Sequence, residues 1–163
     1  MQNNNIIWRI DDRLIHGQVI MGWCSRLPID LLIVCDDEIA TNEWERNLLL
    51  MAVPPNFKVE VLGIDDTFQQ SKKWESHYKQ VLVLLKSPEI LKDLITTGIE
   101  IKKVNVGGIH FQKDRKEYLS YLFLSQEEIE IFKDLMNKGV YFECQDLPTS
   151  NAYNLMKIID KKA

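Results

Sequence analysis

Residues 9–18 read Arg-Ile-Asp-Asp-Arg-Leu-Ile-His-Gly-Gln, which places His16 at the end of a dense cluster of charges. An apolar run before this cluster has the composition of a buried strand, and apolar side chains at helical spacing follow over residues 17–27. His16 is therefore expected at a helix N-terminus, where free N–H groups and the helix dipole favour a bound anion such as phosphate. The same dipole disfavours the imidazolium ion and leaves a neutral nitrogen able to attack.

The cluster contains the groups that phosphoryl transfer to a histidine requires. A neutral nitrogen of His16 would attack a phosphoryl donor in line, and catalysis would consist mostly of positioning and of stabilising charge on the equatorial oxygens. Arg13 would supply the cation, and Asp11 or Asp12 would hold either the imidazole tautomer or the arginine. The first backbone N–H groups of the helix would form the phosphate cradle, those of Gly17, Gln18 and Val19.

Two other interpretations of these residues stay open. Arg9 and Asp11 point to the same side of the predicted strand, so they can form a structural ion pair without any catalytic role. Alternatively, Asp11, Asp12 and His16 could ligate a divalent metal in a hydrolase. The arginines between them speak against this second alternative, because cations repel a metal ion.

Strands and helices alternate along the whole chain, with Ser87, Pro88 and Gly98 as clear helix punctuation. Ser125 and Glu128 form a predicted capping box at the start of a later helix. Strands are expected at residues 6–10, 31–35, 57–62, 81–85, 103–106, 118–122 and 140–144. Helices are expected at residues 17–27, from Thr41 or Asn42 to 52, and at 65–79, 88–97, 126–138 and 151–159.

This alternation predicts an α/β protein: one domain spanning residues 1–163, with an open, mostly parallel twisted β-sheet and helices on both of its faces. Sheets of this kind bind ligands beyond the carboxyl ends of their strands. The loops expected at that edge are residues 12–16, 36–40, 86–87 and 107–110.

The composition of the chain narrows the classes of function. Hydrophobic residues make up 45% of the 163 residues, charged residues make up 27%, and the net charge is −4 without a basic block. Nucleic acid is therefore not an expected partner. Cys24, Cys35 and Cys144 fit neither a disulfide framework nor a zinc site and are interpreted as reduced core thiols. No stretch is long and apolar enough to span a bilayer, so the protein is expected in the cytoplasm.

The motif at residues 9–19, followed by Trp23, resembles the signature of the IIB components of the mannose/fructose/sorbose family of the bacterial phosphoenolpyruvate-dependent sugar phosphotransferase system. Residues 34–40 (VCDDEIA), 52–55 (AVPP) and 103–108 (KVNVGG) resemble further segments of that family. These matches follow one another in the family's order over nearly the whole chain, so the resemblance is specific.

The resemblance implies that His16 is phosphorylated on Nδ1 by a phosphorylated IIA protein, separate from this chain. His16 would then pass the phosphoryl group to a sugar held by the membrane components IIC and IID, which makes the chain a phosphotransferase docked to the inner face of the membrane without a cofactor or metal. An alternative is a regulatory relative that is phosphorylated but does not transfer to sugar. The family's active-site loop maps onto Arg13 and onto the backbone of Leu14, Ile15, Gly17, Gln18 and Val19, with Arg9, Asp11 and Asp12 in the same motif.

Other residues carry weaker signals. His110 could face the site or be solvated, and Ser87 could reach phosphate or simply cap a helix. Gly107 and Gly108 could admit the loop that carries His16 or make a turn. Trp23 and Trp44 are expected in the core or on a docking surface. The sequence names neither the sugar nor the oligomeric state.

Overall fold

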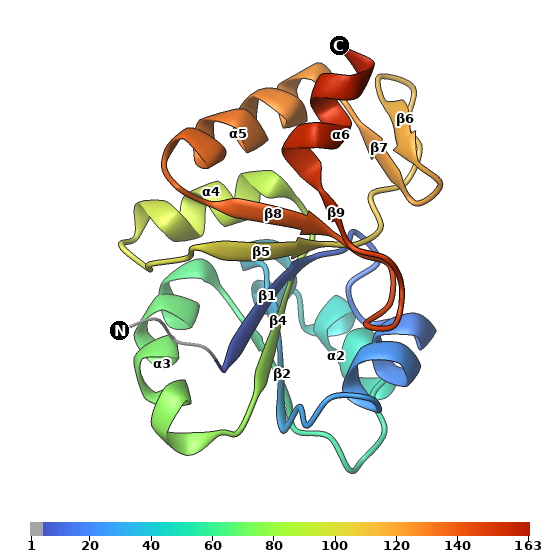
Figure 1. Ribbon diagram of the computed structural model, residues 1–163. Coiled ribbons are helices and arrows are strands. Elements are labelled where there is room, and N and C mark those ends of the chain that lie inside the picture. The colour runs from blue at the N-terminus through green and yellow to red at the C-terminus, as the bar shows by residue number, and fades with distance from the viewer. Residues whose placement is uncertain (1–4) are drawn as a thin grey trace.

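The computed structural model describes residues 5–163 and contains a seven-stranded sheet with the order β3-β2-β4-β1-β5-β8-β9 (Figure 1). Every neighbouring pair is parallel except β8 and β9, which are antiparallel. The strands are β1 (Ile6–Ile10), β2 (Leu31–Cys35), β3 (Val59–Leu62), β4 (Val81–Leu85), β5 (Lys103–Val106), β8 (Tyr141–Cys144) and β9 (Tyr153–Asn154). The predicted open, mostly parallel sheet is confirmed.

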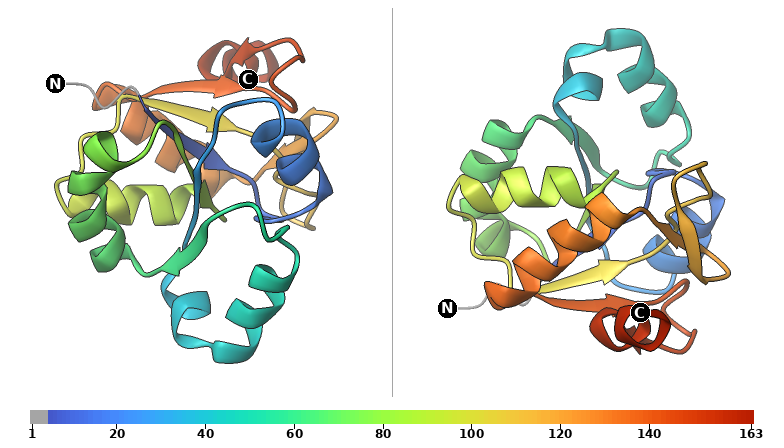
Figure 2. Two further views of the ribbon diagram at one scale, coloured as in Figure 1. Left: turned by 90° about the horizontal axis from the view of Figure 1, so that it is seen from below. Right: turned by 90° about the horizontal axis from the view of Figure 1, so that it is seen from above.

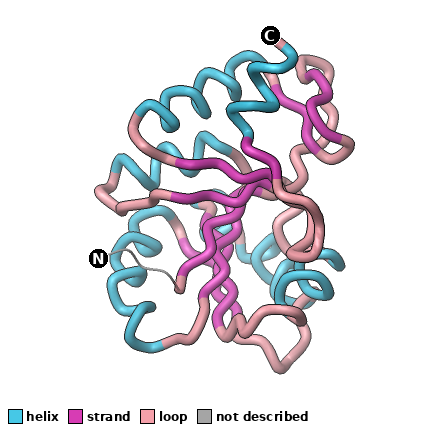
Figure 3. Tube along the Cα trace, viewed as in Figure 1, coloured by secondary structure: helices cyan, strands magenta, loops and turns pink. Residues whose placement is uncertain are grey.

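Helices cover both faces of this sheet. Successive side chains of a strand point to opposite faces, so strands that are apolar throughout need a covering layer on each face. Leu31 and Ile33 of β2 belong to the larger core cluster, which includes residues of α3 (Ile64–His77), α4 (Pro88–Thr96), α5 (Gln126–Asn137) and α6 (Leu155–Lys162). Leu32 and Val34 face the other way, toward η1 (Val19–Cys24) and α1 (Asp37–Thr41). Figure 2 shows η1 across the strands from α3 and α4, and Figure 3 shows the strands running between the helices.

Local signals in the sequence explain most of the helix boundaries. Ser87 caps α4 with Pro88 at its first position, and Ser125 forms the predicted capping box with Glu128 at the start of α5. Gly98 and Gly139 follow α4 and α5 with positive φ angles of 105° and 98°. These conformations are the ones in which glycine ends a helix without steric cost.

Several predicted boundaries are wrong. The helix expected at residues 17–27 is a short segment whose main part is the π-helix η1. Residues 36–40, expected as a loop, contain α1, which Asp36 caps, and Asn42 then caps a second helix, α2 (Glu43–Met51). The strand expected at 118–122 is instead an antiparallel hairpin of β6 (Lys116–Leu119) and β7 (Leu122–Leu124). The last helix starts later than predicted, because β9 precedes α6 and Asn154 caps that helix.

The sheet opens between two of its central strands. β1 pairs with β4 over its whole length, but it pairs with β5 only at Arg9 and Ile10. The strands therefore meet at their carboxyl ends and diverge toward their amino ends. The loop after β1 leaves the sheet at this closed end, beside the segment after β5.

Candidate active site

A tight turn carries the chain from β1 to His16. The N–H of Leu14 donates to the carbonyl oxygen of Asp11 at 3.0 Å, and Leu14 adopts a positive φ of 56°. This conformation costs a non-glycine residue about 1–2 kcal/mol. The side chains of Leu14 and Ile15 are buried in the core cluster under η1, and this packing holds the turn in place.

The turn folds His16 back over Asp11. The Nε2 atom of His16 is buried and lies 3.2 Å from Oδ2 of Asp11, in a close contact that is not a well-formed hydrogen bond. The side chain as a whole is 15% exposed. Since Nε2 faces the protein, Nδ1 is the nitrogen on the accessible side of the ring. A carboxylate at Nε2 favours the tautomer with its proton there, which leaves the lone pair on Nδ1.

Asp11 is the centre of this arrangement. Its buried carboxylate lies 3.4 Å from both Nη2 of Arg9 and Nε of Arg13, and it also accepts the N–H of Gly108 at 3.4 Å. Burial raises the pKa of Asp11, but the contact with His16 and the charges of Arg9 and Arg13 outweigh burial and lower the pKa to about 2. Asp11 is therefore ionised near neutral pH, as its contact with His16 requires.

Arg13 is the accessible cation of the motif. Its side chain is 35% exposed and is held between Asp11 and Gln18, whose Oε1 accepts from Nη2 at 2.9 Å. This guanidinium lies near the surface on the loop that carries His16. Its role as the cation for an incoming phosphoryl group stays a prediction, with which this exposure is compatible.

The structure places Arg9 differently from the prediction that it contacts phosphate. Its side chain is 1% exposed, stacks over the Trp23 ring at 4.4 Å, and donates to Oδ1 of Asn105 and to the carbonyl oxygens of Gln145 and Asp146. These acceptors occupy both terminal nitrogens of the guanidinium, while its Nε is buried without a hydrogen-bond partner in residues 5–163. Arg9 therefore ties β1 to the segment after β8 and fixes Asp11.

Gly107 makes room for this buried arginine. A Cβ atom at residue 107 would lie 2.2 Å from Nη2 of Arg9 and 2.5 Å from its Cζ. Of the two roles predicted for this glycine, close approach is thus the one the structure has, but the group that approaches is Arg9 and not the loop that carries His16. Gly108 similarly allows two side chains to come close, because a Cβ atom at residue 108 would lie 3.0 Å from Cε1 of His110 and 3.4 Å from Nη2 of Arg13.

Asp12 turns away from His16, contrary to one of its predicted roles. Its Oδ1 lies 2.5 Å from Nδ1 of His110, and its Oδ2 accepts the N–H of His110 at 2.8 Å. The carbonyl oxygen of His110 accepts from Arg115, which pairs in turn with Glu128. Asp12 therefore joins the loop after β1 to the loop after β5.

The backbone of the loop has free N–H groups at most of the positions predicted to form a phosphate cradle. The N–H groups of Ile15, Gly17, Gln18 and Val19 donate to no acceptor within residues 5–163. Leu14 is an exception, because its N–H is already bonded to Asp11. The loop thus offers free donors beside the accessible nitrogen of His16, as phosphate binding requires.

Two other predicted groups have structural roles or do not converge. Ser87 caps α4, with its hydroxyl accepting the N–H of Ile90 at 3.5 Å. Asp11, Asp12 and His16 do not form a ligand set, and across residues 5–163 no three histidine, cysteine or acidic groups lie close enough to hold a metal ion. The metal-hydrolase alternative therefore has no geometric support.

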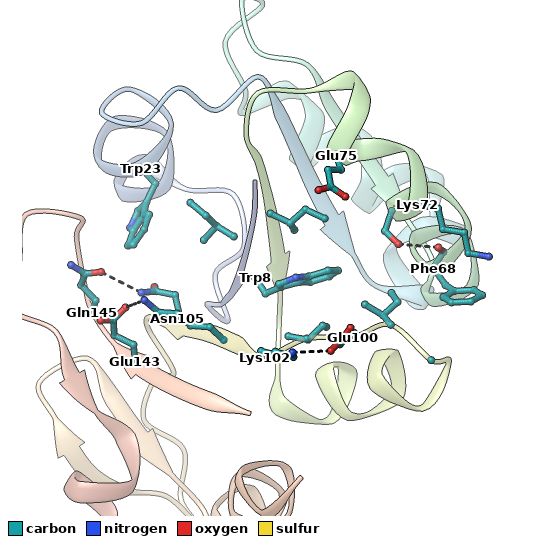
Figure 4. A pocket seen from close by; sticks show the side chains of 17 residues that line it. Trp8, Trp23, Phe68, Lys72, Glu75, Glu100, Lys102, Asn105, Glu143 and Gln145 are labelled. Atoms are coloured by element: carbon teal, nitrogen blue, oxygen red, sulfur yellow. Dashed lines mark hydrogen bonds and ion pairs between the residues drawn. The ribbon is translucent and has the colours of Figure 1, made fainter. Parts of the chain in front are cut away.

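A cavity of about 640 Å³ lies in the opening between β1 and β5 (Figure 4). Trp8, Trp23 and Phe68 form part of its wall, together with Asn105 and Gln145, which surround Arg9. Its lining comes from the amino-terminal part of β1 and from α3, β5 and β8, not from the loop that carries His16. His16 therefore lies outside this cavity, on the loop that follows β1.

Sequence reasoning missed several partners of the predicted residues. Asn105 is a buried polar residue between two buried valines of β5, and this unusual position was a usable signal for a buried hydrogen-bond partner. Gln145 and Asp146 act on Arg9 through their carbonyl oxygens, which any residue could supply. No side-chain pattern could have revealed those contacts.

The chain is similar to one family over nearly its whole length: the family described as "PTS system sorbose subfamily IIB component" matches residues 6–163. It is 32% identical to the PTS system fructose-specific EIIB component of Bacillus subtilis (strain 168), covering 96% of both chains. It is 29% identical to the PTS system mannose-specific EIIAB component of Escherichia coli (strain K12), over 94% of this chain and 47% of that protein. The crystal structure of the IIBSor domain of the sorbose permease from Klebsiella pneumoniae matches with a TM-score of 0.86, 27% identity and 98% coverage of both chains.

Proposed function

The chain belongs to the sorbose subfamily of IIB components of the phosphotransferase system and is a phosphotransferase that carries phosphoryl groups in sugar uptake, and we propose that His16 is the residue that carries them. The accessible Nδ1 of His16, set by the buried contact between Nε2 and Asp11, is the observation that supports this proposal most directly. Within residues 5–163, no helix is both long and apolar enough to cross a membrane.

The first half of the reaction charges the histidine. The lone pair of Nδ1 attacks the phosphorus of a phosphorylated IIA partner, the new P–N bond forms, and the bond to the donor breaks with its electron pair leaving on the donor. Asp11 stabilises the positive charge that develops on the ring, and Arg13 and the free N–H groups of the loop stabilise the phosphoryl oxygens.

The second half of the reaction transfers the phosphoryl group from His16 to the sugar. A sugar hydroxyl attacks the phosphorus, a P–O bond forms, the P–N bond breaks, and its electron pair returns to Nδ1 while the hydroxyl proton passes to water. The sugar would be held by the membrane components IIC and IID. Relatives of one fold carry fructose-specific and mannose-specific names, which supports placing sugar selection outside this chain.

The cysteines are poor alternatives as the phosphoryl acceptor. Cys24, Cys35 and Cys144 are all buried. Burial raises the pKa of Cys24 to about 11 and the pKa of both Cys35 and Cys144 to about 12. A thiol must be ionised and accessible to act as a nucleophile, and these thiols are neither.

The decisive experiment measures the intact mass of the protein after incubation with phosphoenolpyruvate, the general phosphotransfer proteins and a IIA protein. Wild type should gain one acid-labile phosphoryl group, and His16→Ala should gain none. His110→Ala is the matched control, because His110 is a neighbouring histidine on a loop at the same sheet edge, and it should be charged like wild type. Phosphorylation that persists in His16→Ala, with the IIA protein shown to be charged, would refute the assignment.

A further inference from the structure

The helix α2 has apolar side chains on two opposite sides. Leu49 packs against the core cluster under η1, and Leu50 beside it is only partly exposed. Trp44, Leu48 and Met51 lie at helical spacing on the other side, where Trp44 is 72% exposed and Met51 is 81% exposed. A helix that is apolar on both sides normally has a second layer covering it. Here the outer stripe, formed by Trp44, Leu48 and Met51, faces solvent.

Acidic side chains border this outer stripe. Glu43 and Glu45 precede and follow Trp44, and on a helix they lie to either side of it. Residues 37–51 contain four carboxylates and one cation, Arg46. The guanidinium of Arg46 donates to the carbonyl oxygen of Ala40 at 2.9 Å, so that cation is turned toward its own chain. The stripe is therefore an apolar strip within a negative surface.

The helix that carries the outer stripe follows a segment that leaves the sheet at the same edge as the loop with His16. α1 begins directly after β2 and α2 follows it, while the loop that carries His16 begins directly after β1. These strands are parallel and are separated in the sheet by β4 alone. Both segments thus leave the same edge, about 10 Å apart at a strand spacing of about 4.8 Å. A partner seated on α2 can therefore also reach His16.

We propose that the outer stripe is the docking surface for the membrane protein that presents the sugar. This proposal rests on the proposed function. Loops on the cytoplasmic side of membrane proteins carry an excess of lysine and arginine, which complements the acidic border formed by Glu43 and Glu45. An apolar helix face that inserts into a groove supplies the affinity, with Trp44 as its anchor. The same carboxylates disfavour direct binding to an anionic lipid surface.

The test uses inverted membrane vesicles that contain IIC and IID components, and vesicles from cells that lack them. Cosedimentation of uncharged protein measures docking, and loss of the phosphoryl group on addition of sugar measures transfer. Trp44→Glu/Met51→Glu should weaken docking at least about tenfold and slow transfer at limiting vesicle concentration. Charging by the IIA protein should stay within about twofold of wild type.

Two further variants make the result specific. Met156→Glu places a charge on an exposed methionine of α6, far from α2, and should leave docking and transfer unchanged. Glu43→Lys/Glu45→Lys should weaken docking and remove most of its salt dependence. Because all of these positions are exposed, thermal unfolding should show that each variant remains folded.

Four results would overturn the proposal. Docking that Trp44→Glu/Met51→Glu leaves intact would show that the stripe is not used. Slower charging with normal docking would assign the stripe to the IIA donor. A concentration-dependent dimer by light scattering that the double variant abolishes would assign it to a second copy of the chain, and equal binding to both kinds of vesicle would assign it to lipid. Docking is measured without phosphorylation, so a failure of wild type to be charged on His16 would count against the proposed function and not against this surface.

Discussion

Arg9 and Arg13 contact the same carboxylate from opposite sides, but one belongs to the interior and the other to the surface. Arg9 is enclosed by Trp23, Asn105 and backbone carbonyl groups, so its side chain contacts other residues of the protein and not solvent. Arg13 is partly exposed and is held by only two side-chain contacts. The motif therefore has an inner half, Arg9 and Asp11, and an outer half, residues 13–18.

This difference explains how a surface loop can keep a precise geometry. Asp11 belongs to a buried network in which each charge is paired, and such networks are rigid because leaving one member unpaired is costly. The outer half can then exchange partners at each turnover while Asp11 stays fixed beneath His16. The inner half is thus the scaffold, and the outer half is the surface on which we propose that the chemistry takes place.

Removing Arg9 should break the scaffold and produce the largest loss of stability. Arg9→Met leaves the buried Asp11 without its innermost cation, which is expected to cost about 3–5 kcal/mol in the free energy of unfolding. Urea unfolding at neutral pH measures this loss. Gly107→Ala should displace the Arg9 side chain, because the added Cβ overlaps the guanidinium. It should lower the free energy of unfolding by about 1–3 kcal/mol. A stability of Arg9→Met close to that of wild type would contradict the assignment of Arg9 to the scaffold.

Removing Arg13 should lower the rate of phosphorylation and leave the stability nearly unchanged. Arg13→Ala is expected to lower the rate of phosphorylation by about 100-fold, since a cation aimed at the phosphoryl oxygens is lost. Its effect on the free energy of unfolding should stay below about 1 kcal/mol, because the side chain is partly exposed. Rapid-quench measurement of charging by the IIA protein tests the rate. Arg26→Ala, at an exposed arginine outside the motif, is the control and should match wild type in both measurements.

Much of this fold could be predicted because its elements have strong local signals. The continuous apolar runs of β2 and β4 indicate buried strands. The capping residues of α4 and α5 indicate where those helices begin. The local hairpin of β6 and β7 was predicted as a single strand, and the short β9 was missed. β9 has only two residues, too few to show alternation, and it forms by pairing with β8.

The site was predictable in its identity and less so in its contacts. The motif indicated which residues act together, but strand alternation alone could not separate the roles of Arg9 and Arg13. Their difference arises from Asn105 and the segment after β8, which reach Arg9 from residues far along the chain. The contact of Asp12 with His110 likewise joins two loops that are far apart in the sequence.

Acid titration should show the contribution of Asp11 to stability. Its pKa is about 2 in the folded protein and 3.8 in its ordinary state, so the unfolded chain takes up the proton first as the pH falls. The stabilisation is complete above about pH 4 and is lost as the pH falls through 2, and it amounts to about 2 kcal/mol. Urea unfolding of wild type and Asp11→Asn between pH 2 and 6 measures it. The difference in stability between the two proteins should shrink by that amount on acidification, and a constant difference would show that Asp11 does not have this low pKa.

The smallest effect on stability is expected from Gly17→Ala. This substitution distinguishes two roles of the outer half: contacting the phosphoryl oxygens through N–H groups, or leaving room for the phosphoryl group over the Cα of Gly17. A Cβ at Gly17 would meet no atom of residues 5–163 within 4 Å, so Gly17→Ala should change the free energy of unfolding by less than about 0.5 kcal/mol. Because the substitution keeps the N–H group, charging should stay within about twofold of wild type if the backbone alone contacts the phosphoryl oxygens. The phosphorylation rate by rapid quench measures this. A large loss of rate without loss of stability would place the phosphoryl group directly over the Cα of Gly17, where the absence of a side chain, and not the N–H group, is what the reaction needs.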